Sequence, residues 1–233
     1  MNKPYHILLE EKLDHIKHHL KEGGIKPSLL LHACCGPCSS YVLEYLLSYF
    51  SITVYFYNPN IHPAAEYNRR QTELENFVKE FRAQNEVQGL SLVCEQGYNP
   101  EEYFTATGTK ENNDLQVERE KGERCRRCYE FRMKKAFEYA AQNSFDYVTT
   151  TLSISPHKDA EKINTIGETL GKLVENPKYL FADFKKKSGF KRSLELSDEY
   201  GLYRQDYCGC VYSMRTPQIL EKAFYNLILT SPV

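Results

Sequence analysis

Residues 28–38 read SLLLHACCGPC, and this stretch decides the fold. Its first six residues, Ser28 to Ala33, form an apolar run of the length of one buried strand. Three cysteines and a Gly36-Pro37 pair follow at once, and proline is favoured in the first turn of a helix. The stretch therefore predicts a buried strand that passes directly into a helix, with cysteines at the junction.

The same alternation of strand and helix continues along the chain. Apolar and β-branched runs predict strands, and the longer segments between them predict helices. The expected strands are 28–33, 52–57, 90–95, 147–151 and 179–184, and the expected helices are 5–21, 37–49, 64–85, 101–107, 126–142, 159–174 and 217–229. Such alternation is typical of a parallel sheet covered by helices on both faces. We therefore expect an α/β, Rossmann-like fold with a metal or ligand site at the carboxyl ends of the strands.

The composition bounds the class of protein. The chain has 233 residues, with 30 Lys and Arg against 31 Asp and Glu, so its formal net charge is −1. That balance excludes a basic nucleic-acid coat and an acidic tail, and 41% hydrophobic residues supply a sizeable core. Residues 1–22 lack the apolar run of a signal peptide, and no stretch approaches the ~18 apolar residues of a membrane span. We expect a cytoplasmic protein without membrane contact.

The placement of the cysteines is the most informative feature of the chain. Seven of the eight fall into three groups, whereas Cys94 ends an apolar run and is expected in the core. A reducing cytoplasm disfavours structural disulfides, so grouped cysteines indicate metal ligands or redox thiols. The groups are Cys34, Cys35 and Cys38; Cys125 and Cys128; and Cys208 and Cys210.

Seven grouped thiols exceed the needs of one metal site. A structural zinc and a 4Fe–4S cluster each take four ligands, which two cysteines of the first group can supply together with Cys125 and Cys128. Cys208 and Cys210 are candidates for a redox-active pair, because a disulfide across one residue is strained and easily reduced; they are equally able to bind a metal. The surplus of thiols favours an iron–sulfur cluster over zinc.

Polar and basic side chains elsewhere are candidates for substrate binding. Asn58, Asn60, His62 and Arg70 follow the second expected strand, where amide side chains bind a polar ligand or merely cap a turn. Five cations within residues 185–192 form either a solvated face or a phosphate-binding patch, and they are Lys185, Lys186, Lys187, Lys191 and Arg192. The cations beside the second cysteine group balance thiolate charge or contact an RNA backbone, and they are Arg124, Arg126 and Arg127.

Several blocks of the sequence resemble the QueH family of epoxyqueuosine reductases. The blocks are LLLHACCGPCSSY (29–41), VYFYNPNIHPAAEYNRR (54–70), GERCRRCYEFRM (122–133), TTTLSISPHKD (149–159), FKKKSGFKRS (184–193) and YRQDYCGCVYS (203–213). The resemblance implies a single α/β domain over residues 1–233. In that domain residues 28–215 are the family core, 1–24 are an N-terminal helical extension, and 216–233 form a C-terminal helix.

The resemblance also implies an activity and its cofactor. Members of the family perform the last step of queuosine synthesis, in which the epoxide of epoxyqueuosine in a tRNA anticodon is reduced to the alkene, without cobalamin. Carried onto this chain, Cys34, Cys35, Cys125 and Cys128 would hold a 4Fe–4S cluster, and Cys208 and Cys210 would be the redox-active pair or second-metal ligands. Some members carry Asp at the position of Cys38, beside a mononuclear iron. The cysteine in this chain leaves open whether a second metal, iron or zinc, is bound there.

The chemistry of the reaction sets further requirements. Removal of an epoxide oxygen as water needs two electrons and protons, whereas one cluster usually transfers a single electron at a time. A dithiol or a second metal would complete the transfer. The reaction also needs an electron donor, which the sequence does not identify. Candidate proton donors are His32, Tyr129, Asp206 and Tyr207.

Two other classes of protein compete with this hypothesis. A cluster-bearing tRNA thiolase would carry a pyrophosphate loop after the first strand, where this chain has cysteines, Gly36 and Pro37. A zinc-stabilised RNA-binding module without catalysis would differ in metal content. A likeness to the cysteine-rich domains of heterodisulfide reductases rests on Cys34, Cys35 and Gly36 alone.

Overall fold

Five parallel strands form the only sheet of the described residues, which are 3–214 of this computed structural model. The strands are β1 (Ser28–Ala33), β2 (Ser51–Phe56), β3 (Leu90–Cys94), β4 (Tyr147–Thr150) and β5 (Lys178–Tyr179), in the order β3-β2-β1-β4-β5. The apolar run that opens the family core is thus the central strand. Its register pairs Leu30 with Thr53 on one side and with Val148 on the other. The predicted α/β fold with a parallel sheet is confirmed.

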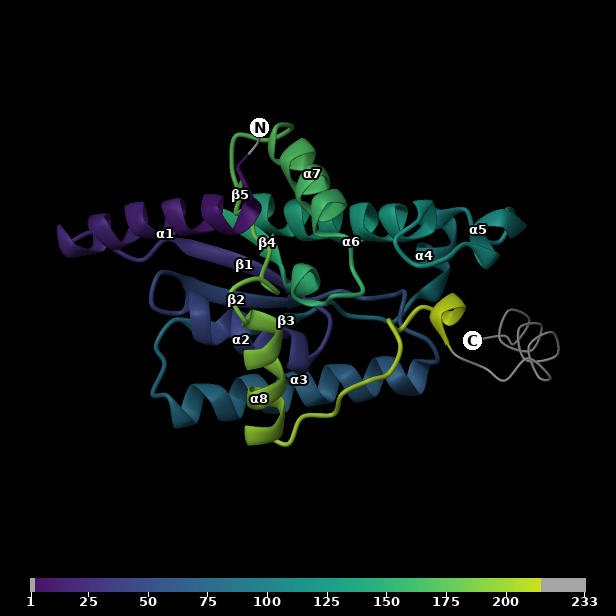
Figure 1. Cartoon of the computed structure of the whole chain (residues 1–233), viewed down its shortest axis with the longest axis horizontal. Helices are drawn as coiled ribbons and strands as arrows, with labels where there is room; N and C mark the ends of the chain where they lie inside the picture. The colour runs from purple at the N-terminus through teal and green to yellow at the C-terminus, as the bar shows by residue number, and fades with distance from the viewer. Residues whose placement is uncertain (1–2, 215–233) are drawn as a thin grey trace.

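The side chains of alternate residues of β1 pack into two separate hydrophobic clusters. Leu29 and Leu31 belong to a core that also contains side chains of α2 (Gly36–Leu46) and α3 (Ala64–Gln84). Leu30 faces the other way, toward α6 (Glu123–Gln142), and α7 (Ala160–Gly171) packs beside α6. All three leucines are fully buried, which stabilises the fold by roughly 1.5–3 kcal/mol per side chain. Figure 1 shows α6 and α7 on one side of the strands and α2 and α3 on the other.

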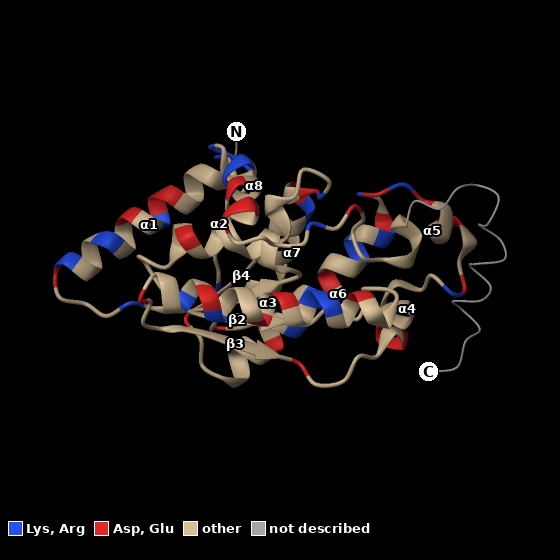
Figure 2. Ribbon diagram, turned by 90° about the horizontal axis from the view of Figure 1, so that it is seen from below, with Lys and Arg blue, Asp and Glu red and all other residues tan. Residues whose placement is uncertain are grey.

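Helix α1 (Tyr5–Lys21) packs into the same core as the central strand. Its buried residues Leu9, Leu13 and Ile16 have helical spacing and join the cluster that holds Leu29 and Leu31. The opposite side of α1 is charged, and Figure 2 shows acidic and basic residues interspersed along it and along α3. The segment expected as an extension therefore shares the main hydrophobic core.

The last strand is shorter than the sequence predicts. β5 contains only Lys178 and Tyr179, whereas residues 179–184 were expected to be a strand. Beyond Tyr179 the backbone of Ala182 exchanges two hydrogen bonds with the side chain of Asn164 on α7. β4 itself ends at Thr150 and passes into a 3₁₀ helix, η1 (Thr151–Ile154). Residues 180–184 therefore continue outside the strand ladder, with Leu180, Ala182 and Phe184 buried.

Several further elements differ from expectation. The sequence did not predict α5 (Asn113–Val117), the helix α8 (Gly189–Glu199) or the 3₁₀ helix η2 (Val211–Ser213), whereas α4 (Pro100–Thr107) lies where a helix was expected. Helix α8 packs on the outside of α2. The expected helix over 217–229 and the rest of segment 216–233 lie outside the described residues. Among residues 3–214, no helix has both the length and the apolar character needed to span a membrane.

Candidate metal centre

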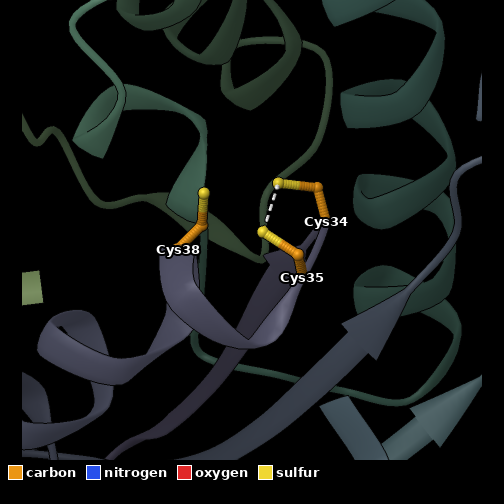
Figure 3. Close-up of side chains that lie close together, drawn as sticks. All are labelled: Cys34, Cys35 and Cys38. Atoms are coloured by element: carbon orange, nitrogen blue, oxygen red, sulfur yellow. Dashed lines mark hydrogen bonds between the residues drawn. The ribbon is translucent and has the colours of Figure 1, made fainter. Parts of the chain in front are cut away.

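Three cysteines gather where the central strand passes into α2. Cys34 and Cys35 directly follow β1, and Cys38 lies in the first turn of α2. Their three sulfur atoms lie within 4.8 Å of one another, and the Sγ atoms of Cys34 and Cys35 are 3.8 Å apart. Figure 3 shows the three sulfurs turned toward a common point. Tetrahedral thiolates bound at ~2.3 Å from one metal lie roughly as far apart as these two sulfurs, so this group can hold a metal.

The surroundings of Cys34 favour its thiolate form, which is the form that binds metals. Hydrogen bonds from Cys35 and Cys38 hold the pKa of Cys34 well below its ordinary value, and the positive charges of Lys158 and Arg132 act in the same direction. The N-terminus of α2 adds a favourable dipole. A further donor approaches Cys35, whose Sγ accepts a hydrogen bond of 3.2 Å from Nε2 of Gln205.

The second cysteine pair lies on the first two turns of α6. Cys125 packs against the apolar cluster that contains Cys34 and Cys35, and Cys128 is buried in an adjacent cluster with Cys210. Burial raises the pKa of the Cys128 thiol to about 11. The first turns of α6 therefore link the first cysteine group to the third.

The third pair occupies the loop after α8, and its two thiols have different neighbours. Nζ of Lys158 donates a hydrogen bond of 3.2 Å to Sγ of Cys208. Burial alone would raise the pKa of Cys208, but Lys158 and Arg132 outweigh burial and lower it. Cys210 lies 3.0 Å from the hydroxyl of Tyr103, and burial raises its pKa to about 12. One thiol of this pair is thus held toward the thiolate and the other toward the neutral form.

Three cations are buried beside these thiols without a carboxylate within ion-pair distance in the described part of the chain. They are Arg124, Arg132 and Lys158, with exposed fractions of 2%, 1% and 9%. Of the arginines flanking the second pair, Arg126 and Arg127 instead form ion pairs with Glu123 near the surface. The sequence reasoning missed Arg132 and Lys158. The sequence did contain an indication for Arg132, because a residue four positions after Cys128 lies on the same face of the helix.

Asn58 and Arg70 form hydrogen bonds with the backbone beside the cysteines. The side chain of Asn58 donates to the backbone oxygen of Ala33 and accepts from Nη1 of Arg132, so it connects β1 to α6. Arg70 forms an ion pair of 2.6 Å with Glu66 and donates to the backbone oxygen of Cys208 at 3.2 Å. Both residues are buried, and neither lines the cavity beside the cysteines.

Asn60, His62 and His32 are also buried. Within the described residues, neither amide atom of the Asn60 side chain has a hydrogen-bond partner. Nδ1 of His62 lies 3.1 Å from the backbone oxygen of Asn60. His32 lies within the sheet between Thr150 and the backbone oxygen of Tyr57. Burial lowers the pKa of His32 to about 4, so it is neutral at physiological pH.

The basic stretch 185–192 forms ion pairs on and beside α8. Lys185 pairs with Asp183, Lys187 with Glu10, and Lys191 with Glu195. Arg192 contacts three carboxylates, which belong to Glu44, Glu195 and Glu199. Acidic neighbours therefore offset much of the charge that the sequence presents as a basic run.

A cavity of about 500 Å³ opens beside the thiols. Cys34, Cys38 and Cys208 line it together with Lys158, and Arg204 and Phe190 lie on its wall. Of the four candidate proton donors, Asp206 and Tyr207 line this cavity, whereas Tyr129 and His32 do not. Its volume is typical of sites for small organic groups. A larger hollow of about 810 Å³, between α3 and β3, is lined by none of the eight cysteines.

Comparison with known proteins gives a consistent result. A family model described as "Epoxyqueuosine reductase QueH" matches residues 29–216. The chain is 45% identical to the epoxyqueuosine reductase QueH of Streptococcus pyogenes serotype M1 over 197 residues, which are 84% of this chain and 73% of that relative. It is 40% identical to the QueH of Staphylococcus epidermidis (83% and 79% covered) and 32% identical to that of Thermotoga maritima (80% and 90% covered).

Proposed function

The chain belongs to the QueH family, and on that premise we propose that it reduces the epoxide of epoxyqueuosine to the alkene of queuosine in a tRNA anticodon. The chain is then an oxidoreductase with a tRNA substrate and a separate electron donor. One observation of the structure supports this activity above the others: the cavity of about 500 Å³ is lined by cysteines of the first and third groups.

A 4Fe–4S cluster is the cofactor that we propose. Its fit is tested by buried polar atoms without a hydrogen-bond partner in the described part of the chain. Nη2 of Arg132 and Nε of Arg124 are two such atoms, and both residues lie beside thiols. Such donors suit a buried anionic group, which a cluster held by thiolates is. Cys34, Cys35, Cys125 and Cys128 would hold the cluster, which would supply single electrons. Cys38 and Cys208 would remain to bind a second metal, iron or zinc. In the alternative, Cys208 and Cys210 would form a redox-active pair.

The chain's own residues would bind and orient the modified nucleoside. Phe190 and Arg204 line the same cavity as the thiols, so a base could stack on the ring and the guanidinium could meet a phosphate. Asp206 and Tyr207 lie on the same lining and are the proton donors that we favour among the four candidates. For the basic stretch 185–192 we retain only the proposal of an outer tRNA contact, because its ion pairs reduce its free charge.

The decisive test is a reaction with the natural substrate. Reduced, anaerobically purified protein is incubated with tRNA that contains epoxyqueuosine, and the nucleosides are identified by mass spectrometry. We expect conversion to queuosine and, in the same protein, iron together with acid-labile sulfide. Zinc without iron would contradict the cluster and favour a zinc-stabilised RNA-binding module.

A matched pair of cysteine variants tests the assignment of ligands. Cys125→Ala should remove the cluster and abolish turnover, since a ligand on α6 is lost. Cys94→Ala is the control, because this thiol lies at the end of β3 and contacts Glu75. Cys38→Ala should keep the cluster and lose only the second metal. Full iron content and activity in Cys125→Ala would contradict the proposed division of thiols.

A further inference from the structure

Resting on the cluster proposed above, we propose that Arg132 and Lys158 compensate the negative charge of the metal-bound thiolates and thereby set the reduction potential of the cluster. Both side chains are buried beside the cysteines, and they reach them from different elements, α6 and the loop after η1. They are positioning residues, since they act on the cluster through its surroundings and need not touch the substrate.

The contacts of Arg132 leave a positive charge without a negative partner in the protein. Its Nε donates to the backbone oxygen of Cys128 and its Nη1 to Oδ1 of Asn58, both at 3.2 Å. Both acceptors are neutral. Its Nη2 is buried and has no hydrogen-bond partner among residues 3–214.

Arg70 is a buried arginine of the same chain whose charge is balanced by a carboxylate. Arg70 is 1% exposed like Arg132, but its Nε lies 2.6 Å from a carboxylate oxygen of Glu66. A buried charge without such a partner is strongly destabilising. The ionisable acidic groups that act on Arg132 are the thiols of Cys34, Cys128 and Cys208 and the hydroxyl of Tyr129. Burial raises the pKa of Tyr129, which therefore stays neutral and leaves the thiols as the anionic partners. The geometry therefore fits an arginine whose negative partner is a set of bound thiolates.

Lys158 acts on two of the same thiols, Cys34 and Cys208. Its Nζ donates to Sγ of Cys208 at 3.2 Å, and its side chain lines the cavity together with Cys34 and Cys208. No ion pair joins it to a carboxylate among residues 3–214. Arg124 differs from both, since it interacts with Cys125 and Cys210 and already donates to the backbone oxygens of Leu115 and Gln116.

The electrostatic consequence follows from the direction of electron transfer. Reduction adds one negative charge to a cluster in a low-dielectric site, where nearby cations stabilise the added charge strongly. Removal of either cation should therefore make reduction less favourable and lower the potential. Replacement by another cation should largely restore it.

The test is an anaerobic redox titration of the loaded protein, followed by electron paramagnetic resonance. We expect Arg132→Met and Lys158→Met each to lower the equilibrium constant for one-electron reduction at least tenfold, which corresponds to ~59 mV. Arg132→Lys and Lys158→Arg should recover most of that loss. Lys172→Met is the control, because this cation is exposed on α7 and pairs with Glu168.

A second readout, the urea midpoint, separates a charge effect from a structural one. Arg132→Met removes an unpaired buried charge but also the donor to Oδ1 of Asn58, so its urea midpoint is compared with that of the wild type in both the metal-free and the iron-loaded protein. We expect the larger loss of stability in the iron-loaded form, and an equal loss in both forms would assign Arg132 a structural role and overturn the inference for it. If the methionine variants fold but no longer take up iron while the cationic variants do, the charge requirement is supported.

The outcomes also distinguish this inference from the proposed function. Unchanged potentials in both iron-loaded methionine variants would overturn the inference and leave the proposed reductase intact. Wild-type protein that binds no iron would instead contradict the proposed cluster, before any variant is compared.

Discussion

At the scale of single residues, Gly209 controls how the third cysteine pair is presented. Its φ of 108° lies in a region that side chains rarely adopt, and a Cβ there would lie 3.0 Å from Nη1 of Arg70 and from Ile61. The backbone nitrogen of His62 also donates to the oxygen of Gly209. The turn at Gly209 therefore places Cys208 toward Lys158 and Cys210 toward Tyr103.

Gly209→Ala should destabilise this loop and lower activity. Gly201→Ala is the matched control, since Gly201 has a φ of 59° and no neighbour within 4 Å of an added Cβ. We expect the control to cost ~1–2 kcal/mol of unfolding free energy, and Gly209→Ala to cost more because a close contact adds to the backbone strain. Urea unfolding and iron content measure the two effects. Equal losses in both variants would show that packing around Gly209 is unimportant.

The cysteines and the cations of the site differ in how far the sequence predicts them. Clustering made the seven cysteines conspicuous, and the parallel sheet predicted that Cys34 and Cys38 would lie at a strand end. Arg132 and Lys158 were not singled out, because arginine and lysine are usually solvated and only tertiary burial makes these two unusual. For the run 185–192 the sequence left two interpretations open, because two of its carboxylate partners, Glu10 and Glu44, are distant in sequence.

At the scale of elements, α6 joins the metal site to the sheet. Cys125, Cys128 and Arg132 have helical spacing and share one face, and Ala136 and Ala140, one and two turns later, pack against the strands. Most strand and helix positions were predictable from hydrophobic periodicity, with α5 and α8 as exceptions. The short length of β5 was not predictable, because the side chain of Asn164 takes the place of a strand as the hydrogen-bonding partner of Ala182.

The contact between α7 and β5 makes a prediction at this scale. A Cβ on Gly167 would lie 2.2 Å from Cζ of Tyr179, whereas on Gly171 it would meet Tyr179 only at 3.4 Å. Gly167→Ala should therefore lower the free energy of unfolding by ~1–3 kcal/mol despite the better helix propensity of alanine. Gly171→Ala, in the same helix, should be neutral or slightly stabilising. A gain of stability in Gly167→Ala would refute the close packing.

At the scale of the whole molecule, α1 belongs to the main core although the family match begins only at residue 29. Leu13 is 2% exposed and lies in the cluster that contains Leu29 and Leu31. We expect Leu13→Ala to cost ~2–5 kcal/mol of unfolding free energy, as for other buried leucines. Lys12→Ala, on the exposed side of α1, should cost almost nothing. Urea denaturation measures both, and a negligible effect of Leu13→Ala would mean that α1 does not contribute to the stability of the core.

The grouped cysteines of the site lie between positions 34 and 210 of the chain, and this wide separation has a consequence for biosynthesis. At ~5–20 residues per second, a ribosome makes Cys34 about 10–35 s before Cys210. Throughout that interval the first cysteines are present without the last ones. The complete set of thiols exists only after residue 210 has been made, so the full metal complement cannot be bound before that point of synthesis.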